Sequence, residues 1–315
     1  MPNTRTLVAL GITLLTATVA QAAPIATIPV GPRPESITKA WHGKYYVSIQ
    51  GPSGTLGVND GEVRQVDLTT GVVTPFVTGL DNPRGLCFTG KYLIAADQVR
   101  LWKMDEAGNK TVLAEASAFP FPAVFFNDCA PEKGGKAIFV VEMGRRDIIR
   151  IGAPPGTNNV LIPVDSNAAY AVPATSRVYR VTMDGEITSM FEPSRKALVM
   201  NGVTTVKHGH KKGDLLVGDF FHGSIVQVSK KGKKNIIATA FRGMDGIEQH
   251  SDGRYFLSSF ENGQLWKTDK NGENQVLMHS GMGFQSAADF YLDEENKLLY
   301  LPVTPMGAVL VFSTE

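Results

Sequence analysis

The chain has 315 residues, of which 43% are hydrophobic, and it carries 31 Lys and Arg against 30 Asp and Glu. A chain of this length buries a large core. The formal net charge of +1 provides no electrostatic attraction for nucleic acid or for an anionic membrane, so neither is expected as a partner.

The first 22 residues have the pattern of a secretory signal peptide. One cation, Arg5, precedes an apolar run, and an A-x-A cleavage pattern ends at Ala22. Glycine and threonine interrupt the run, which is shorter than the roughly 20 apolar residues that cross a membrane. We therefore expect residues 1–22 to be removed, leaving a mature protein from about Ala23 that is secreted or periplasmic and not attached to the membrane.

The rest of the chain, 23–315, repeats one unit six times, which predicts a single all-β domain. Each unit opens with a small motif and continues into short strands, as in "FNDCAPEK", "KAIFVV" and "SRVYRVT". The aligned opening residues are Glu35, Arg84, Asn127, Asn201, Asp245 and Ala288, and subtraction of their numbers gives spacings of 49, 43, 74, 44 and 43. Because a period of this size with about four strands per unit is typical of a propeller blade, we predict a six-bladed β-propeller.

Two segments lie outside the regular pattern. Only three strands follow Ala288, whereas "PIATIPV" near the mature N-terminus is a β-forming segment without a partner. We expect this segment to close the last blade, because closure removes an exposed strand edge. The long third interval places a loop insertion at about 144–176, rich in Pro, Gly and Asn, which is either a lid over the site or an ordered surface excursion.

The opening residues should form a ring, because the first strand of each propeller blade lines the central channel. Glu35, Asn127, Asn201 and Asp245 would then bring two carboxylates and two carboxamides together. Oxygen donors of this kind bind hard divalent cations, and without a cation the two carboxylates would repel each other. The alternative is that each polar residue caps a turn, which explains one such residue better than four at the same register.

The motifs "PESI", "FND", "MNGV" and "MDGI" at these positions resemble the senescence-marker-protein/gluconolactonase superfamily. These six-bladed propellers include sugar lactonases and the luciferin-regenerating enzyme, and the paraoxonase-like lactonases are more distantly similar. The resemblance runs from about Pro34 to the end of the chain. It implies that Glu35, Asn127, Asn201 and Asp245 bind one catalytic divalent metal, with Ca²⁺ favoured and Mg²⁺, Mn²⁺ or Zn²⁺ as alternatives. It also implies that Asp245 is the general base or the nucleophile, and a carboxylate can take a proton that a carboxamide cannot.

One position departs from the family pattern. Sugar lactonases of the family typically carry an Arg two residues before the first ligand Asn, where this chain has Phe125. The loops expected at the ring end add more apolar side chains, including Met143 and Met306. The candidate substrate-binding residues are Arg84, Phe125, Phe220, Phe221, His222 and Phe260. We therefore expect an apolar substrate, unless these side chains pack between blades; Arg84 is equally suited to contact substrate or to balance Glu35.

Together these features predict an exported, metal-dependent hydrolase of a lactone or related ester. The alternative is a non-catalytic propeller that binds a small molecule or a protein and keeps the metal for structure, because propellers host many functions. The sequence does not indicate an oligomeric state. Cys87 and Cys129 could pair in an oxidising compartment, but both lie in apolar, strand-like segments, which favours unpaired thiols.

Overall fold

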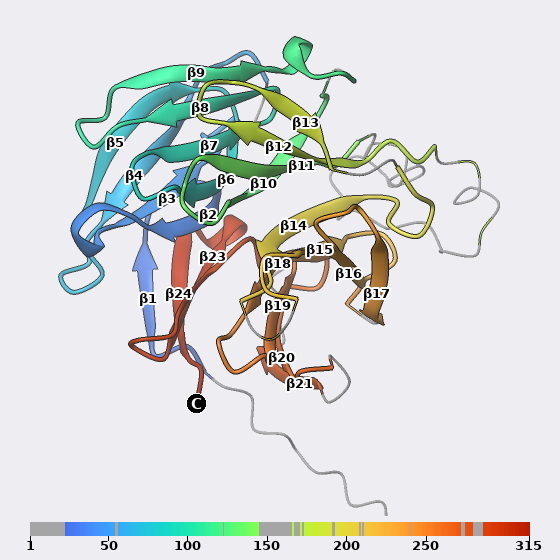
Figure 1. The fold of residues 1–315 in the computed structure, drawn as a ribbon. Coiled ribbons are helices and arrows are strands. Elements are labelled where there is room, and N and C mark those ends of the chain that lie inside the picture. Colours follow the sequence, from blue (N-terminus) through green and yellow to red (C-terminus); the bar gives the residue numbers. More distant parts are fainter. Residues whose placement is uncertain are drawn as a thin grey trace, which may run out of the picture.

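The structure is a computed structural model that describes residues 23–315 except 54–55, 122, 145–165, 167–170, 172, 191–192, 208, 210, 240, 272–274 and 280–285. It forms six four-stranded antiparallel sheets arranged as the blades of a propeller (Figure 1), which confirms the predicted fold. The expected signal peptide, 1–22, lies outside the described residues. Within the described ranges, no helix is long and apolar enough to cross a membrane.

In the first five blades, the strands run outwards from the channel in the order in which they occur in the chain. Blades 1 and 2 contain β2 (Pro34–Lys39), β3 (Tyr45–Ile49), β4 (Gly61–Val66), β5 (Val73–Leu80), then β6 (Pro83–Phe88), β7 (Leu93–Asp97), β8 (Arg100–Met104) and β9 (Lys110–Glu115). Blades 3 and 4 contain β10 (Phe126–Pro131), β11 (Ala137–Glu142), β12 (Arg177–Thr182), β13 (Ile187–Ser189), then β14 (Met200–Thr205), β15 (Leu215–Asp219), β16 (Ser224–Val228) and β17 (Lys234–Thr239). Blade 5 contains β18 (Met244–Gln249), β19 (Tyr255–Ser259), β20 (Gln264–Thr268) and β21 (Gln275–His279). Short 3₁₀ turns lie at Trp41–Gly43, Ala116–Ala118 and Thr304–Met306.

The last blade is built from both ends of the described chain. Its inner strands are β22 (Tyr291–Asp293), β23 (Leu298–Val303) and β24 (Ala308–Ser313), and its outer strand is β1 (Ala26–Pro29). β1 pairs antiparallel with β24 from Ala26 opposite Val311 to Pro29 opposite Ala308. The predicted closure by the N-terminal segment is therefore confirmed, and it covers an edge that β24 would otherwise expose.

The hydrophobic core is divided among the contacts between blades. Among the described residues, six buried clusters each combine side chains of two neighbouring blades, and together they run round the whole ring. The contact between the last and first blades, for example, packs Ile28 and Val309 with Ile37 and Val47. Each blade is thus held by apolar burial on both faces, and the innermost strands are fixed relative to one another.

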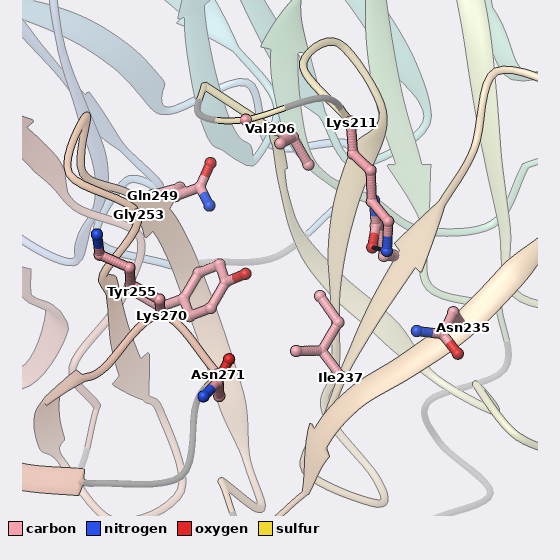
Figure 2. Close-up of a pocket in the computed structure, with 11 residues that line it drawn as sticks. Val206, Lys211, Asn235, Ile237, Gln249, Gly253, Tyr255, Lys270 and Asn271 are labelled. Carbon is pink, nitrogen blue, oxygen red and sulfur yellow. Dashed lines mark hydrogen bonds between the residues drawn. The ribbon is translucent and has the colours of Figure 1, made fainter.

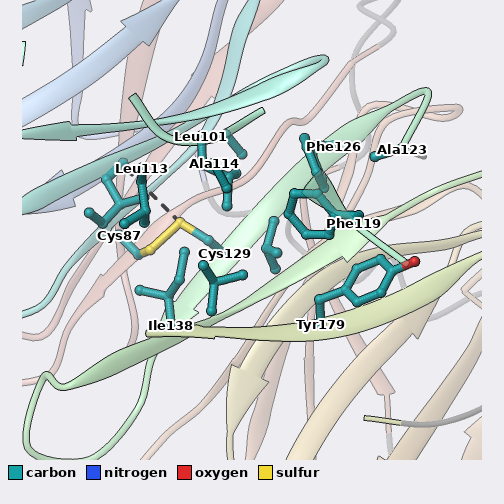
Figure 3. Close-up of a cluster of buried hydrophobic side chains, with 14 residues drawn as sticks. Cys87, Leu101, Leu113, Ala114, Phe119, Ala123, Phe126, Cys129, Ile138 and Tyr179 are labelled. Atoms are coloured by element: carbon teal, nitrogen blue, oxygen red, sulfur yellow. Dashed lines mark hydrogen bonds between the residues drawn. A yellow bond between two sulfur atoms is a disulfide. The ribbon is translucent and has the colours of Figure 1, made fainter. Parts of the chain in front are cut away.

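The cysteines form a disulfide, so the expectation of unpaired thiols was wrong. Cys87 in β6 and Cys129 in β10 are bonded across the contact between blades 2 and 3, within the cluster drawn in Figure 3. Their Cα atoms are 5.7 Å apart, which is the ordinary separation for a disulfide. The physical reason is the repeat itself, because a separation of 42 residues is about one blade and places both residues at matching levels of adjacent innermost strands.

Candidate active site

A β-bulge at the same place in five blades turns the opening residues out of the strand ladder. Glu35, Arg84, Asn127, Asn201 and Asp245 are each the second residue of an innermost strand. The pairing of that strand with the next shifts register between Pro34 and Ile37, Pro83 and Leu86, Phe126 and Cys129, Met200 and Val203, and Met244 and Ile247. Bulges re-aim side chains in this way. All five opening residues are buried, at 1% to 5% exposure, and Ala288 adds a buried methyl group in the sixth blade.

The glycine after Asn201 is required by the neighbouring blade and not by a turn. Gly202 lies inside β14, and a Cβ at this position would collide with the backbone carbonyl oxygen of Asp245. Glycine permits such close approach of two backbones. The Asn-Gly pair therefore belongs to a strand of the channel, and the turn-capping interpretation does not apply to Asn201.

Glu35 and Arg84 form a buried ion pair in the ring. Arg84 Nη1 donates to Glu35 Oε1 over 3.1 Å, and Gln50 Nε2 donates to the other oxygen, Oε2, over 2.6 Å. The guanidinium of Arg84 also lies 4.3 Å from the ring centroid of Phe125, a cation–π arrangement. Both charges are thus compensated inside the protein, which a buried ion pair requires.

Three buried oxygen atoms of the ring have no hydrogen-bond partner in the part of the chain that the structure describes. They are Oδ1 of Asn127, Oδ1 of Asn201 and Oδ1 of Asp245, from blades 3, 4 and 5. Buried polar atoms are nearly always paired in native proteins, so three such atoms at one register need an explanation. Two carboxamide oxygens and a carboxylate oxygen fit the preference of a hard divalent cation for oxygen ligands. Within the described residues, no group of three or more His, Cys, Asp or Glu gathers as a metal site, because half of this donor set is Asn.

The environment of Asp245 strongly disfavours its charge. Burial raises the pKa of this carboxyl group well above its usual range, and the nearby charges of Glu35 and Asp289 raise it further. Arg84 and a hydrogen bond with Asn201 act in the opposite direction. These interactions place Glu35, Arg84, Asn201 and Asp245 in one electrostatic group. Asn127 is held separately, since its Nδ2 donates to Met143 Sδ over 3.1 Å.

A second layer of polar side chains lies directly behind the ring and links the blades. Asp128 Oδ2 accepts a 2.7 Å hydrogen bond from the backbone N–H of Val203 in the next blade. Ser36 Oγ donates to Asp289 Oδ2 over 2.6 Å and accepts from the backbone N–H of Leu86 over 3.1 Å. These hydrogen bonds cross three of the contacts between blades. The residues that directly follow the opening residues therefore fix the diameter of the channel.

Asp289 should make the stability of the metal-free protein depend on pH. Burial raises the pKa of its carboxyl group to about 7, and the charges of Glu248 and Glu35 add to this effect against the hydrogen bond from Ser36. In the unfolded chain this carboxyl group loses its proton near pH 4. The contribution of Asp289 to the free energy of unfolding is therefore fully present below pH 4 and is lost as the pH rises to about 7. The resulting decrease in the free energy of unfolding is at most about 4 kcal/mol.

The measurement is the free energy of unfolding in urea between pH 4.5 and 8 in EDTA. We expect Asp289→Asn, which cannot ionise, to show a clearly smaller decline than the unmodified protein. Asp105→Asn is the control, because a hydrogen bond with Asn109 lowers the pKa of this exposed carboxyl group and it stays ionised over the range. Equal slopes for all three proteins would contradict the assignment to Asp289.

The apolar residues expected at the rim form a closed cluster beside the ring. Phe125, Met143, Leu198, Val199, Phe220 and Phe221 pack together, with Ala174 and Phe260 against them. Phe125, Phe220 and Phe221 are 4%, 3% and 0% exposed, so they pack on one another and do not present an open wall. Met306 lies apart at 36% exposure. Most of the insertion expected at 144–176, and with it the question of a lid, lies outside the described residues.

Acidic side chains at the ends of three second strands hold the loops above the ring. Asp97 Oδ2 accepts from the backbone N–H of Asp81, Glu142 Oε1 from those of Val124 and Phe125, and Asp219 Oδ1 from that of Val199. In blade 4 the carboxylate has a second partner, since Asp219 Oδ2 lies 2.5 Å from His222 Nδ1. Sequence reasoning placed His222 near the site but missed this pair, although the D-x-x-H spacing was available.

Two cavities lie at the opposite end of the propeller from the ring. One of about 540 Å³ opens between blades 4 and 5 and is lined by residues such as Val206, Gln249 and Tyr255 (Figure 2). The other, of about 1220 Å³, is lined by residues of blades 2, 3 and 4 and lies next to Pro131 and Thr205. Gln249, Pro131 and Thr205 end the innermost strands whose second residues belong to the ring, so neither cavity belongs to the candidate site.

Comparison with known proteins supports the fold and leaves the chemistry open. No protein-family model matches the chain, and no curated protein matches it. Among solved structures, the chain is similar to an X-ray structure titled a "putative gluconolactonase", with a TM-score of 0.62 and 16% sequence identity over 94% of this chain and 92% of that one. This match fits the superfamily resemblance carried by the ring motifs, and at this identity it shows the shared propeller fold.

Proposed function

We propose that this protein is an exported hydrolase that uses one divalent cation, with Ca²⁺ favoured, to open a lactone or cleave a related ester. The observation that carries the proposal is the set of three buried, unpaired oxygen atoms that Asn127, Asn201 and Asp245 contribute from adjacent blades. The similarity to a structure titled a gluconolactonase supports the lactonase class.

The residues of the ring have distinct parts in this mechanism. Glu35, Asn127, Asn201 and Asp245 would hold the cation, which when bound would polarise the substrate carbonyl and acidify water. Asp245 takes the proton of the attacking water or attacks the acyl carbon itself, because it is the carboxylate without a paired Oδ1. The two asparagines bind without adding negative charge. Arg84, already fixed by Glu35, offers a cationic donor for substrate oxygen atoms.

The surroundings of the ring favour an apolar substrate over a sugar lactone. Where a sugar lactonase would place an arginine, this chain has Phe125, whose ring covers Arg84. Export is supported by the leader pattern and by the disulfide between Cys87 and Cys129, since disulfides persist in oxidising compartments.

The test is hydrolysis of a panel of lactones and aryl esters by purified protein that begins at Ala23. We expect activity that EDTA abolishes and that one of Ca²⁺, Mg²⁺, Mn²⁺ or Zn²⁺ restores, with aryl or alkyl substrates preferred over sugar lactones. A protein that binds one metal tightly yet turns over nothing with any ion would contradict the proposal and would favour the binding-propeller alternative.

A further inference from the structure

The turn between β15 and β16 joins the segments that precede two of the proposed ligands. The backbone N–H of Phe220 donates to Val199 O over 2.8 Å, just before Asn201 in β14. On the other side, the N–H of Gly243 donates to Phe220 O over 2.8 Å, just before Asp245 in β18. His222 lies in this turn. Its backbone is therefore held at the ring end of the channel, between the blades of Asn201 and Asp245.

His222 is oriented by a carboxylate that is itself fully buried. Asp219 is 0% exposed, and its oxygen atoms also accept from the backbone N–H groups of Leu198, Val199 and Phe221 at 3.1 to 3.3 Å. The imidazole uses Nδ1 for Asp219 at 2.5 Å and packs edge-on against Phe221, with 28% of its side chain exposed. A carboxylate on Nδ1 fixes the ring orientation and leaves Nε2 for chemistry. Among the described residues, Nε2 makes no hydrogen bond.

We propose that His222, positioned by Asp219, is the general acid that protonates the leaving oxygen of the substrate; this inference rests on the proposed hydrolase function. In the first step water adds to the acyl carbon, its proton goes to Asp245, and the π pair of the carbonyl moves to oxygen. In the second step the carbonyl re-forms, the bond to the leaving oxygen breaks with its electron pair, and that oxygen takes the proton from Nε2 of the imidazolium. Solvent then removes the proton from Asp245 and returns one to His222.

The charged groups around the imidazole are those of the elements packed against its turn. Asp219 is the last residue of β15, directly before the turn. Arg242, in the segment before β18, donates from Nε to Phe221 O over 3.2 Å, and Glu261 of the β19–β20 turn acts electrostatically on Arg242. Asp219 is the group in direct contact with the imidazole, so it is the one that fixes the orientation of the ring and directs Nε2 away from itself.

The decisive experiment compares two esters with the same acyl group, a nitrophenyl ester and an ethyl ester. Nitrophenolate leaves without a proton, whereas ethoxide needs one. We expect His222→Gln to lower kcat/KM for the ethyl ester by roughly 10²–10⁴-fold and to change that for the nitrophenyl ester less than about threefold. The alkaline limb of the pH profile should also disappear for the ethyl ester. Added imidazole should restore ethyl-ester cleavage to His222→Ala.

Two matched controls separate this role from a structural one. His250→Gln removes another histidine next to an aspartate, Asp252 at 3.0 Å, at the opposite end of the propeller, and should change neither ester. Asp97→Asn weakens the loop-holding carboxylate of blade 2 and should leave the pH profile unchanged. Asp219→Asn, which weakens the contact that orients the imidazole, should lower kcat/KM for the ethyl ester more than for the nitrophenyl ester. Equal losses on both esters, or no loss on either, would overturn the assignment of His222, whereas absence of any turnover by the unmodified protein would refute the hydrolase itself.

Discussion

Asp245→Asn is expected to abolish catalysis while making the metal-free protein more stable. Burial and the charges of Glu35 and Asp289 raise the pKa of the Asp245 carboxyl group well above its usual range, so above the ordinary pKa of an aspartate this group lowers the free energy of unfolding of the metal-free protein. An amide of the same shape removes that cost. It also removes the carboxylate that takes the proton, and turnover should fall by roughly 10²–10⁴-fold. Ester hydrolysis in the restoring ion and urea unfolding in EDTA at pH 8 measure the two effects.

The control for this prediction is Asp289→Asn, one layer behind the ring. Asp289 is also buried, with its pKa raised to about 7 chiefly by burial, but it hydrogen-bonds to Ser36 and is not one of the proposed ligands. This variant should share the gain in stability at pH 8 and retain turnover. If Asp245→Asn kept its activity, the assignment of the catalytic carboxylate would be wrong; if it lost stability in EDTA, the electrostatic account of the ring would be wrong.

The stability gain would have a functional meaning. One carboxylate oxygen, Oδ1 of Asp245, and two amide oxygens without hydrogen-bond partners among the described residues are costly in the empty ring, and they are the atoms that a cation would satisfy. Binding to the folded state alone would stabilise the protein by mass action. The ring therefore trades folding stability for a preformed set of ligands, as sites built for binding commonly do.

The repeat made most of the fold predictable. The recurring strand pattern predicted six blades, and the shortfall of strands after Ala288 implied closure by the N-terminal segment. The alignment of the opening residues placed five of them at equivalent positions, and each is the second residue of an innermost strand. These features depend on short-range alternation and a constant period, which a single sequence displays. The bulge that turns Asn201 and its counterparts inwards is a property of strand pairing and appears only in the structure.

The environment of the site was less predictable, because it depends on contacts between distant segments. Phe220 and Phe221 looked like an open apolar rim, yet they are buried against Phe125 and Met143. Arg84 had two possible roles, and the structure pairs it with Glu35. The order of strands and loops indicates that such side chains gather at one end of the propeller, but their partners are decided by packing across blades.

Removal of the disulfide is expected to cost a large part of the folding stability. The bond between Cys87 and Cys129 closes a loop of 42 residues, and the chain-entropy model gives about 4 kcal/mol for a loop of that length. The variant Cys87→Ala/Cys129→Ala tests this, and alanine is preferable to serine because both positions lie in an apolar cluster where a hydroxyl would be buried without a partner. Urea unfolding should show the loss, and the single variant Cys87→Ala should lose as much as the double variant.

The double variant also tests whether the disulfide helps to hold the residues of the ring in position. Cys87 follows Arg84 within β6, and Cys129 follows Asn127 within β10, so the covalent bond joins the two innermost strands close behind two residues of the ring. Without it, the spacing of blades 2 and 3 rests on the apolar cluster and on hydrogen bonds such as that from the backbone N–H of Phe126 to Gln98 O over 2.8 Å. We expect calorimetric titration to show weaker binding of the restoring metal to the double variant while its far-UV circular dichroism is unchanged. An unchanged metal affinity, together with the expected loss of stability, would mean that the disulfide constrains only the unfolded chain and has no part in holding the ring.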